Sequence, residues 1–281
     1  MKKLIVNADD FGISEGINAG IIECFRNGIV RSTSLMSNIP GFEKSVQLLK
    51  KEPDLSVGLH LNITCGSSLS SPREISSLLD KNNTFYSLSR FMSRLFLGRI
   101  SLREVEKEFS AQIERVIESG INLEHIDSHR HIHFHPAIGR VLLGLSSRFG
   151  IRRIRSVSLG LWRGSFYKKQ ILFRKGIYIG FVKQLILSKI ASPLQRPMSN
   201  LNNAGHVFGV GYVPKGYYKE ALYHYIKNIP QGVSEIVCHP GYVDNDLKEY
   251  DFWTDMREEE LRAITAKETL DVVRKFNVTL I

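Results

Sequence analysis

Short apolar segments alternate with helix-like segments along almost the whole of this chain, and this order limits the folds open to it. The first apolar strand, Leu4–Val6, is followed by a helix that Ser14 can cap and Gly28 can end. Repeated strand–helix order is typical of a parallel sheet or barrel. Because strands are predicted at both ends of the chain and could lie side by side, we favour a closed or nearly closed barrel over an open doubly wound sheet.

The remaining elements follow the same alternation. Strands are expected at 32–36, 55–61, 123–126, 234–238 and 278–281, and helices at 42–50, at 102–118, from Pro136 onward and at 258–276. The Ser-rich stretch 66–89 shows no regular pattern. With 281 residues, 43% of them hydrophobic, the chain can build one large core. We therefore predict a single α/β domain that spans residues 1–281.

Four polar clusters each follow an apolar strand. They are Asn7–Gly12, His60 with Asn62, the histidine-rich run 127–135, and His239–Gly241. In parallel α/β folds the carboxyl ends of the strands share one face, and this face carries the active site. A lone His60 in an apolar run is more often a hydrogen-bonded core histidine, but the joint pattern predicts an open, catalytic metal site with Asp and His ligands.

The clusters also suggest a division of roles. Asp9 and Asp10 are adjacent at a strand end and point in different directions, so one could bind metal while the other handles protons. In an extended run, the alternating histidines would all face the same way, and we expect one ligand, one substrate contact and two supporting or surface groups. His133 and His135 could equally be ordinary loop residues, and Asp127 could orient a site histidine or form a turn.

The stretches Asn7–Gly12, Val57–Asn62 and His125–His133 resemble the signature motifs of the YdjC-like carbohydrate deacetylases. This family includes chitooligosaccharide deacetylases and hopanoid-biosynthesis deacetylases. The motifs occur in order and cover the first half of the chain, together with Cys238–Gly241. The resemblance implies a distorted β/α barrel and the metal-dependent removal of an N-acetyl group from an amino sugar.

The resemblance also implies roles for individual residues. The implied metal ligands are Asp10, His60 and His129, with Asp9 as the base and His239 as the general acid. We expect substrate contacts from Asn62, His131 and His206. The family suggests Mg²⁺, although a site with two imidazoles would also suit Zn²⁺, Co²⁺ or Mn²⁺.

The net charge of +10 is unevenly distributed. From Ser128 to Lys219 there are 16 Lys and Arg residues and no Asp or Glu, whereas the rest of the chain has 22 basic and 28 acidic residues. This asymmetry favours an anionic partner, which could be a membrane surface, a phosphorylated ligand or nucleic acid. The alternative is a solvated basic face.

The basic stretch also carries an amphipathic pattern between Leu159 and Pro197. Its aromatic residues, which interleave with Lys and Arg, are Trp162, Phe166, Tyr167, Phe173, Tyr178 and Phe181. This pattern predicts a basic amphipathic helix or pair that lies on an anionic membrane, or else a helical insertion at about 158–197 that packs on the barrel. Together with Gly205–Gly209 it resembles the hopanoid-associated branch, so we favour a lipid-linked N-acetylglucosamine over a soluble chitooligosaccharide.

The location expected from the sequence is the cytoplasm, with at most peripheral contact at the inner face of the membrane. The three cysteines, Cys24, Cys65 and Cys238, are widely spaced and odd in number, as reduced thiols are. The apolar start ends at Asn7, too early for an export signal. The stretch 176–191 is too short and too charged to span a membrane. The chain could also form a homodimer.

Two other classes of function stay open. The basic region and the metal cluster could belong to a nucleic-acid-binding, metal-dependent phosphodiesterase, but the sequence contains no recognisable nucleic-acid-binding module, so we expect no nucleic-acid partner. A non-catalytic sugar- or membrane-binding protein is the third class, and the intact Asp9, Asp10, His60 and His129 argue against it. Acetate release that is lost after chelation would separate the enzyme from both alternatives.

Overall fold

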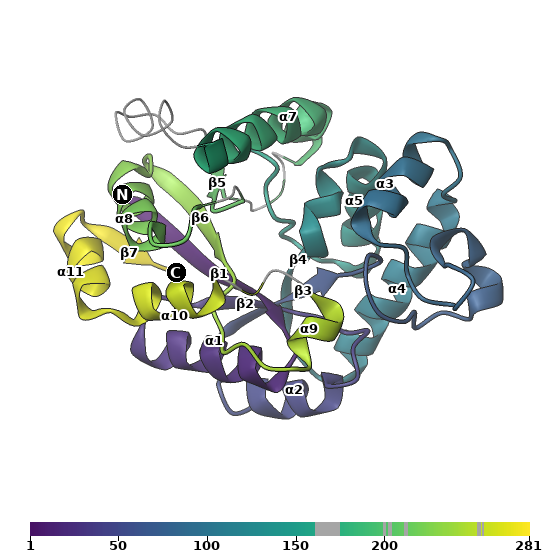
Figure 1. Cartoon of the computed structure of the whole chain (residues 1–281), viewed down its shortest axis with the longest axis horizontal. Helices are drawn as coiled ribbons and strands as arrows, with labels where there is room; N and C mark the ends of the chain where they lie inside the picture. Colours follow the sequence, from purple (N-terminus) through teal and green to yellow (C-terminus); the bar gives the residue numbers. More distant parts are fainter. Residues whose placement is uncertain (161–174, 199–200, 202–203, 211–212, 252–253, 255) are drawn as a thin grey trace.

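The described strands all run parallel and form one curled sheet around a central strand, β1 (Lys2–Phe11) (Figure 1). This computed structural model describes residues 1–160, 175–198, 201, 204–210, 213–251, 254 and 256–281. β1 pairs with β2 (Ser32–Leu35) on one side and with β6 (Gly232–Cys238) on the other. β7 (Val278–Leu280) also pairs with β1, so the two terminal strands do lie side by side as predicted.

The sheet closes on itself through a short segment that is not a regular strand. From β2 the order continues through β3 (Ser56–Leu61) to β4 (Leu123–Ser128), and β5 (His206–Phe208) lies beyond β6. Residues 153–160 bridge the gap between β4 and β5, because Ile154 pairs with Ile126 and Leu159 pairs with Val207. A few backbone hydrogen bonds accompany these two bridges. The predicted single-domain, distorted parallel β/α barrel is therefore confirmed.

Helices cover the outer side of the barrel (Figure 1). α1 (Glu15–Asn27) begins where predicted, because the Ser14 hydroxyl accepts a hydrogen bond from Ile17 N, and it ends at Gly28. The other helices are α2 (Phe42–Leu49), α3 (Leu88–Phe96), α4 (Leu102–Glu118), α5 (Pro136–Phe149), α7 (Lys175–Met198), α8 (Tyr218–Asn228), α9 (Leu247–Tyr250), α10 (Arg257–Thr265) and α11 (Lys267–Lys275), with the 3₁₀ turns η1 (Pro72–Glu74), η2 (Ser76–Leu78) and η3 (His129–Phe134).

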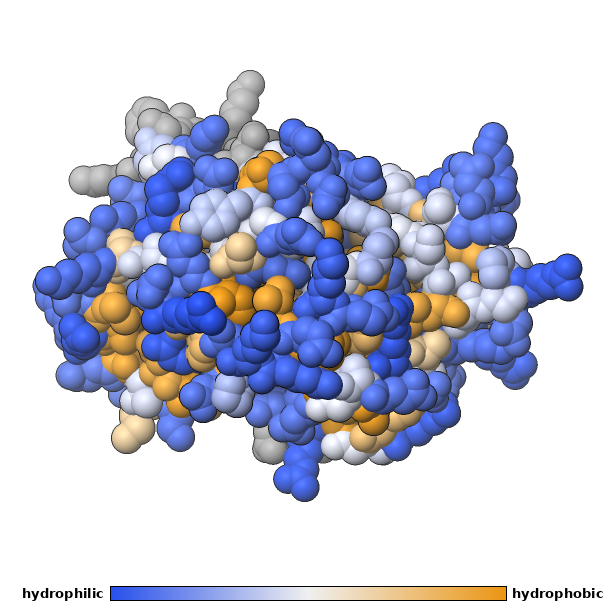
Figure 2. Space-filling view, turned by 90° about the horizontal axis from the view of Figure 1, so that it is seen from below, coloured by the Kyte–Doolittle hydropathy of each residue, from blue (hydrophilic) through white to orange (hydrophobic). Residues whose placement is uncertain are grey.

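The face of the molecule that carries α1 and α2 is mostly hydrophilic (Figure 2). Figure 2, seen from the side of α1 and α2, shows polar side chains with smaller apolar patches between them. Among the helices that the structure describes, none has the length and hydropathy needed to cross a membrane. The three cysteines are free thiols, in line with the prediction.

Two local predictions were wrong. The helix expected at 258–276 is divided into α10 and α11, because Ala266 has an extended backbone with ψ of 135°. The run 129–135 is not extended: it forms η3, in which Arg130 and His131 take left-handed φ values of 56° and 55°.

The insertion predicted at about 158–197 is described only in part. α7 supplies the described helix of this region, and it packs against α5 and η3. The aromatic residues Trp162, Phe166, Tyr167 and Phe173 lie outside the described residues. The extent of the insertion therefore stays a prediction.

The barrel interior contains an ion-pair network. Arg155 is fully buried, and its guanidinium donates to both carboxylate oxygens of Asp9 at 2.7 and 2.6 Å and to Glu235 Oε1 at 2.7 Å. Its Nη2 also lies 2.6 Å from Asp127 Oδ2. Buried charges are costly unless they are paired, so this arginine balances three interior carboxylates.

Gly58 leaves the space that this interior needs. A Cβ added at Gly58 would lie 2.2 Å from the ring of His125, which is buried and held by Ser34 at 3.2 Å and by Arg153 at 2.8 Å. We therefore expect Gly58→Ala to lower the free energy of unfolding by about 1–3 kcal/mol, as overpacking does. Chemical denaturation would measure the loss. Gly144→Ala, in the exposed part of α5 where an added Cβ meets nothing, is the control and should be neutral or stabilising. Equal stability of the two variants would contradict the prediction.

Candidate metal centre

The polar clusters of the sequence meet at the carboxyl ends of the strands, at the bottom of a cavity of about 360 Å³. Its polar lining includes Asp10, His60, His129, His131 and His239. Part of its wall is apolar and is formed by Leu88 and Met92 of α3, Leu187 and Ile190 of α7, Ile132, Phe134, Val210, Val213 and Met256. The cavity thus joins a charged floor to an apolar wall.

Three of the predicted residues converge on this floor. Asp10 Oδ1 lies 3.3 Å from His60 Nε2, and the rings of His60 and His129 are 5.7 Å apart between centroids. All three residues are buried, and Asp10 Oδ1 has no hydrogen-bond partner among the described residues. Two atoms that bind one ion at about 2.0–2.2 Å lie about 3 Å or slightly more apart, so the spacing of Asp10 and His60 suits a shared cation.

Both imidazoles are held by the nitrogen that faces away from Asp10. His60 Nδ1 donates to Asp127 Oδ1 at 2.6 Å. Asp127 therefore orients a site histidine, which is one of the two roles considered for it from the sequence. His129 Nδ1 lies 2.9 Å from Thr64 Oγ1, and the Thr64 hydroxyl donates in turn to Asn62 Oδ1 at 3.2 Å. A donating Nδ1 leaves the lone pair on Nε2, which is the arrangement that metal-binding histidines use.

The electrostatics of the centre favour a positive charge between its carboxylates. Burial alone would raise the pKa of Asp10, but Arg257, His60 and His129 hold it well below its usual range. Burial opposes protonation of His60, yet the carboxylates of Asp127, Asp9 and Asp10 outweigh it and raise the pKa of His60 to about 10. A metal ion at Nε2 would take the place of that proton. The pKa of His129 is lowered to about 3, mainly by burial, so its ring is neutral at neutral pH.

A second group of donor atoms includes His60 but lies deeper in the barrel. Ligand atoms of Asp9, His60 and Asp127 fall within 4.8 Å of one another and could hold a divalent ion. The Arg155 guanidinium already contacts both carboxylates of this group at 2.6 Å. The donor atoms of Asp10, His60 and His129 do not all meet this spacing. Asp10 Oδ1 and His60 Nε2 nevertheless face one another at 3.3 Å, and no guanidinium of a described residue donates a hydrogen bond to Asp10 Oδ1.

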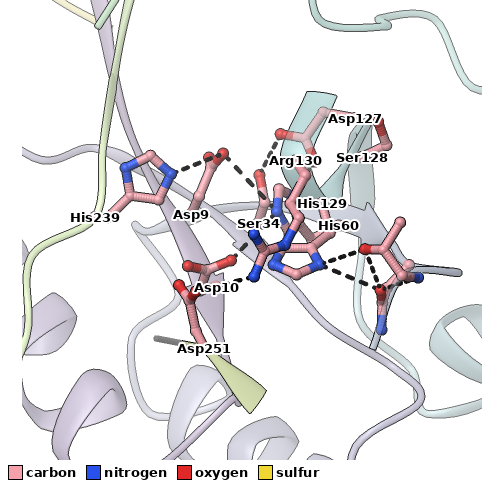
Figure 3. A network of polar contacts seen from close by, with 12 residues as sticks. Asp9, Asp10, Ser34, His60, Asp127, Ser128, His129, Arg130, His239 and Asp251 are labelled. Atoms are coloured by element: carbon pink, nitrogen blue, oxygen red, sulfur yellow. Dashed lines mark hydrogen bonds and ion pairs between the residues drawn. The ribbon is translucent and has the colours of Figure 1, made fainter. Parts of the chain in front are cut away.

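Asp9 and His239 lie beside this set. Figure 3 shows Asp9 between the rings of His239 and His60, and its Oδ2 lies 3.9 Å from Nε2 of each. Asp9 is fully buried and is held from behind by Arg155, whereas the His239 side chain is 29% exposed and lines the cavity. Burial would raise the pKa of Asp9, but Arg155 and the neighbouring histidines lower it far below its usual range.

Of the three residues predicted to contact the substrate, only His131 is among those that line the cavity. His131 lines the cavity, where the left-handed turn of η3 places it. Asn62 is fully buried, and its side chain is taken up by Asn38, Thr64 and the Cys65 carbonyl, so its contacts support His129 rather than a ligand. His206 pairs in register with Ser234, at the amino-terminal half of β6, and is not among the residues that line the cavity.

The other histidines of the run have structural contacts. His133 is buried, and its Nδ1 lies 2.6 Å from Ser128 Oγ. His135 caps α5, since its Nδ1 accepts from Ala137 N at 3.3 Å, and it also lines the cavity. Arg155 and Arg257 were not predicted from the sequence as parts of the site. Arg155 holds Asp9, and Arg257 Nη2 donates to Asp10 Oδ2 at 2.7 Å. The one available signal was that several carboxylates placed in a core require buried cations.

This chain is similar to several known proteins. The model of a family described as YdjC-like protein matches residues 3–275. A carbohydrate deacetylase of Geobacillus stearothermophilus is 32% identical over 93% of this chain and 88% of its own length. A carbohydrate deacetylase of Thermoanaerobacter pseudethanolicus is 29% identical over 100% of this chain and 97% of its own.

One solved structure has a closely similar fold. It is a crystal structure from Enterococcus faecalis V583, of a protein proposed to cleave cellobiose phosphate. The two chains superpose with a TM-score of 0.78 at 25% identity, over 100% of this chain and 97% of the other. The similarity therefore extends over the whole barrel.

Proposed function

Because this chain belongs to the family of YdjC-like proteins, we propose that it is a metal-dependent hydrolase that removes the N-acetyl group from an N-acetylated amino sugar. Its relatives named carbohydrate deacetylases support the reaction class. The observation that carries the proposal is the convergence of Asp10, His60 and His129 beside Asp9 and His239 at one cavity.

We assign the metal to Asp10 Oδ1, His60 Nε2 and His129 Nε2. One carboxylate and two imidazoles suit Zn²⁺, Co²⁺ or Mn²⁺, and the family resemblance suggests Mg²⁺. When bound, the ion would polarise the acetamide carbonyl and lower the pKa of a water molecule. Asp127 and Thr64 fix the orientation of the two rings.

The chain's own groups would move the protons. Asp9 accepts the proton of the attacking water, and the Arg155 fork fixes the direction of its carboxylate. His239 faces the cavity and donates a proton to the departing amine. His131, which also lines the cavity, contacts the substrate.

Mass spectrometry of soluble and lipid-linked N-acetylhexosamines incubated with the protein would test this function. We expect a loss of one acetyl group from at least one substrate, release of acetate, and no reaction after chelation. Readdition of a divalent ion should restore the reaction. Deacetylation that persists in the chelated, metal-free protein would contradict the proposal.

We further propose that the sugar is carried on an apolar group. The cavity wall formed by Leu88, Met92, Leu187 and Ile190 is aliphatic, and aliphatic surface suits a lipid better than a polar oligosaccharide. Leu185 and Ile186 on the same helix, α7, are exposed by 42% and 54%. Together with the acid-free basic stretch, they favour peripheral contact with an anionic membrane.

Vesicle co-sedimentation would test this contact. Each Lys or Arg close to an anionic surface contributes about 1 kcal/mol, so we expect binding to anionic vesicles at low salt that weakens as salt is added. Leu185→Ser with Ile186→Ser should weaken it further, whereas Ile117→Ser, at an equally exposed position on α4, should not. Failure of the unmodified protein to sediment with anionic vesicles at low salt would favour a soluble chitooligosaccharide substrate.

A further inference from the structure

The first turn of α10 carries two buried charged residues that face the metal centre. Arg257 and Glu260 are three residues apart, so they lie on the same face of the helix. Their exposed fractions are 0% and 7%, and both line the cavity. Buried Arg and Glu residues are rare unless they have specific partners, and here both partners belong to the centre.

Arg257 holds the outer oxygen of Asp10. Its Nη2 lies 2.7 Å from Asp10 Oδ2 and 2.8 Å from Asp251 Oδ2. Asp10 itself has a left-handed backbone with φ of 69°, a conformation that a residue other than glycine keeps only when its surroundings impose it. Arg257 therefore fixes the carboxylate so that Oδ1 faces His60 Nε2.

Glu260 holds the segment that carries His239. Its Oε2 accepts a hydrogen bond from His239 N at 2.6 Å. Two residues later, Gly241 N donates to the Arg257 carbonyl at 3.2 Å. Both ends of the short segment His239–Gly241 are thus tied to the same helical turn that holds Asp10.

On the basis of the proposed function, we infer that the first turn of α10 is a positioning element that sets the metal ligand Asp10 and the proton donor His239 relative to each other. Arg257 and Glu260 are the positioning residues. Neither would exchange protons with the substrate. Arg257 acts on metal binding through Asp10, and Glu260 acts on proton transfer through His239.

Titration of the metal-free protein with Mn²⁺ can separate two effects of Arg257 on metal affinity, the positioning of Asp10 and the repulsion between its positive charge and the ion. Loss of a positive charge near a cation site would by itself strengthen binding, whereas loss of positioning would weaken it. We expect Arg257→Met to weaken Mn²⁺ binding about 10–100-fold, the range for residues that support metal ligands. Arg257→Lys keeps the charge, and its Mn²⁺ affinity should lie between those of the unmodified protein and Arg257→Met. If Arg257→Met does not fold, Arg257→Lys still tests the prediction.

Arg262 is the matched control for this experiment. It lies on the same helix but is 69% exposed and pairs only weakly, at 3.6 Å, with Glu258. Arg262→Met should leave Mn²⁺ affinity unchanged. Folded Arg257 variants that bind Mn²⁺ as tightly as the unmodified protein, or more tightly, would overturn the role of Arg257.

The role of Glu260 predicts a different outcome. Glu260→Ala should lower kcat about tenfold or more while Mn²⁺ affinity stays unchanged, because the His239 segment loses its support whereas Asp10 keeps Arg257. Glu260→Gln should restore most of kcat, since its amide oxygen can still accept from His239 N. Glu258→Ala, at an exposed position of the same turn, is the control. A kcat unchanged in Glu260→Ala, or a parallel loss in the Gln variant, would overturn the role of Glu260.

These readouts distinguish the inference from the proposed function. If the unmodified protein binds no divalent ion, the proposed metal site is wrong. If it binds the ion but Arg257→Met and Arg257→Lys bind equally well, the site stands and the role of α10 is wrong.

Discussion

Asp9→Asn is expected to lower turnover by about a hundred- to ten-thousand-fold while Mn²⁺ affinity remains that of the unmodified protein. The substitution keeps the shape of the side chain but removes the group that accepts a proton. Asp10, His60 and His129, to which we assign the metal, are unaltered, and Asp10 keeps its own arginine, Arg257. Steady-state assays of acetate release and a parallel Mn²⁺ titration would measure the two quantities separately.

The stability of Asp9→Asn must be measured as a control, because Asp9 is also a partner of Arg155 and its loss could unfold the protein. A moderate fall in the free energy of unfolding is expected, and assays must be made where the variant is fully folded. Equal turnover of the variant and the unmodified protein would assign the base to another group. A loss of Mn²⁺ binding would instead place Asp9 among the metal ligands, in the deeper set with His60 and Asp127.

Arg155→Met should have the largest effect on stability. Removing the guanidinium leaves the carboxylates of Asp9, Asp127 and Glu235 without their shared cation inside the barrel. Loss of one partner of a single buried ion pair costs about 3–5 kcal/mol, and here three acceptors lose a donor. Since domains are stable by only about 5–15 kcal/mol, we expect the variant to be largely unfolded at 37 °C.

Circular dichroism during thermal and chemical unfolding would measure this effect. Arg155→Lys keeps one charge without the planar fork, and it should remain folded with reduced stability. Arg148→Met is the control. Arg148 is 58% exposed, and its ion pair with Glu114, at 3.9 Å, contributes less than about 1 kcal/mol. If Arg155→Met and Arg148→Met were equally stable, the interior network would have no structural role.

The sequence predicted the barrel and the floor of the centre because both depend on local patterns. Apolar runs such as β3 have a strand signal of their own, and polar residues directly after them must meet at one end of a parallel sheet. As this geometric rule requires, Asp10, His60 and His129 line the same cavity, and their role as metal ligands stays a prediction. His206, which we expected to contact the substrate, does not line this cavity, because β5 is only three residues long and meets β6 nearer its amino end.

The partners of the centre could not be predicted in the same way. Arg257 begins the run Arg257–Glu260, which has the composition of a solvated helix, and nothing local distinguishes its buried residues from its exposed ones. Arg155 lies in the basic stretch that we associated with an anionic partner. Whether such a residue faces solvent or a core carboxylate depends on tertiary contacts between residues up to 247 positions apart in the sequence.

The sheet of this barrel closes at the segment 153–160, which we call the seam. Only single bridges at Ile154 and Leu159 join it to β4 and β5, whereas β1 and β6 share a continuous register from Lys2 to Ala8. Amide hydrogens along the seam should therefore exchange with solvent sooner than those of β1. Because Arg155 belongs to the seam, each opening would also release Asp9, so the proposed base would be held in place only while the barrel is closed.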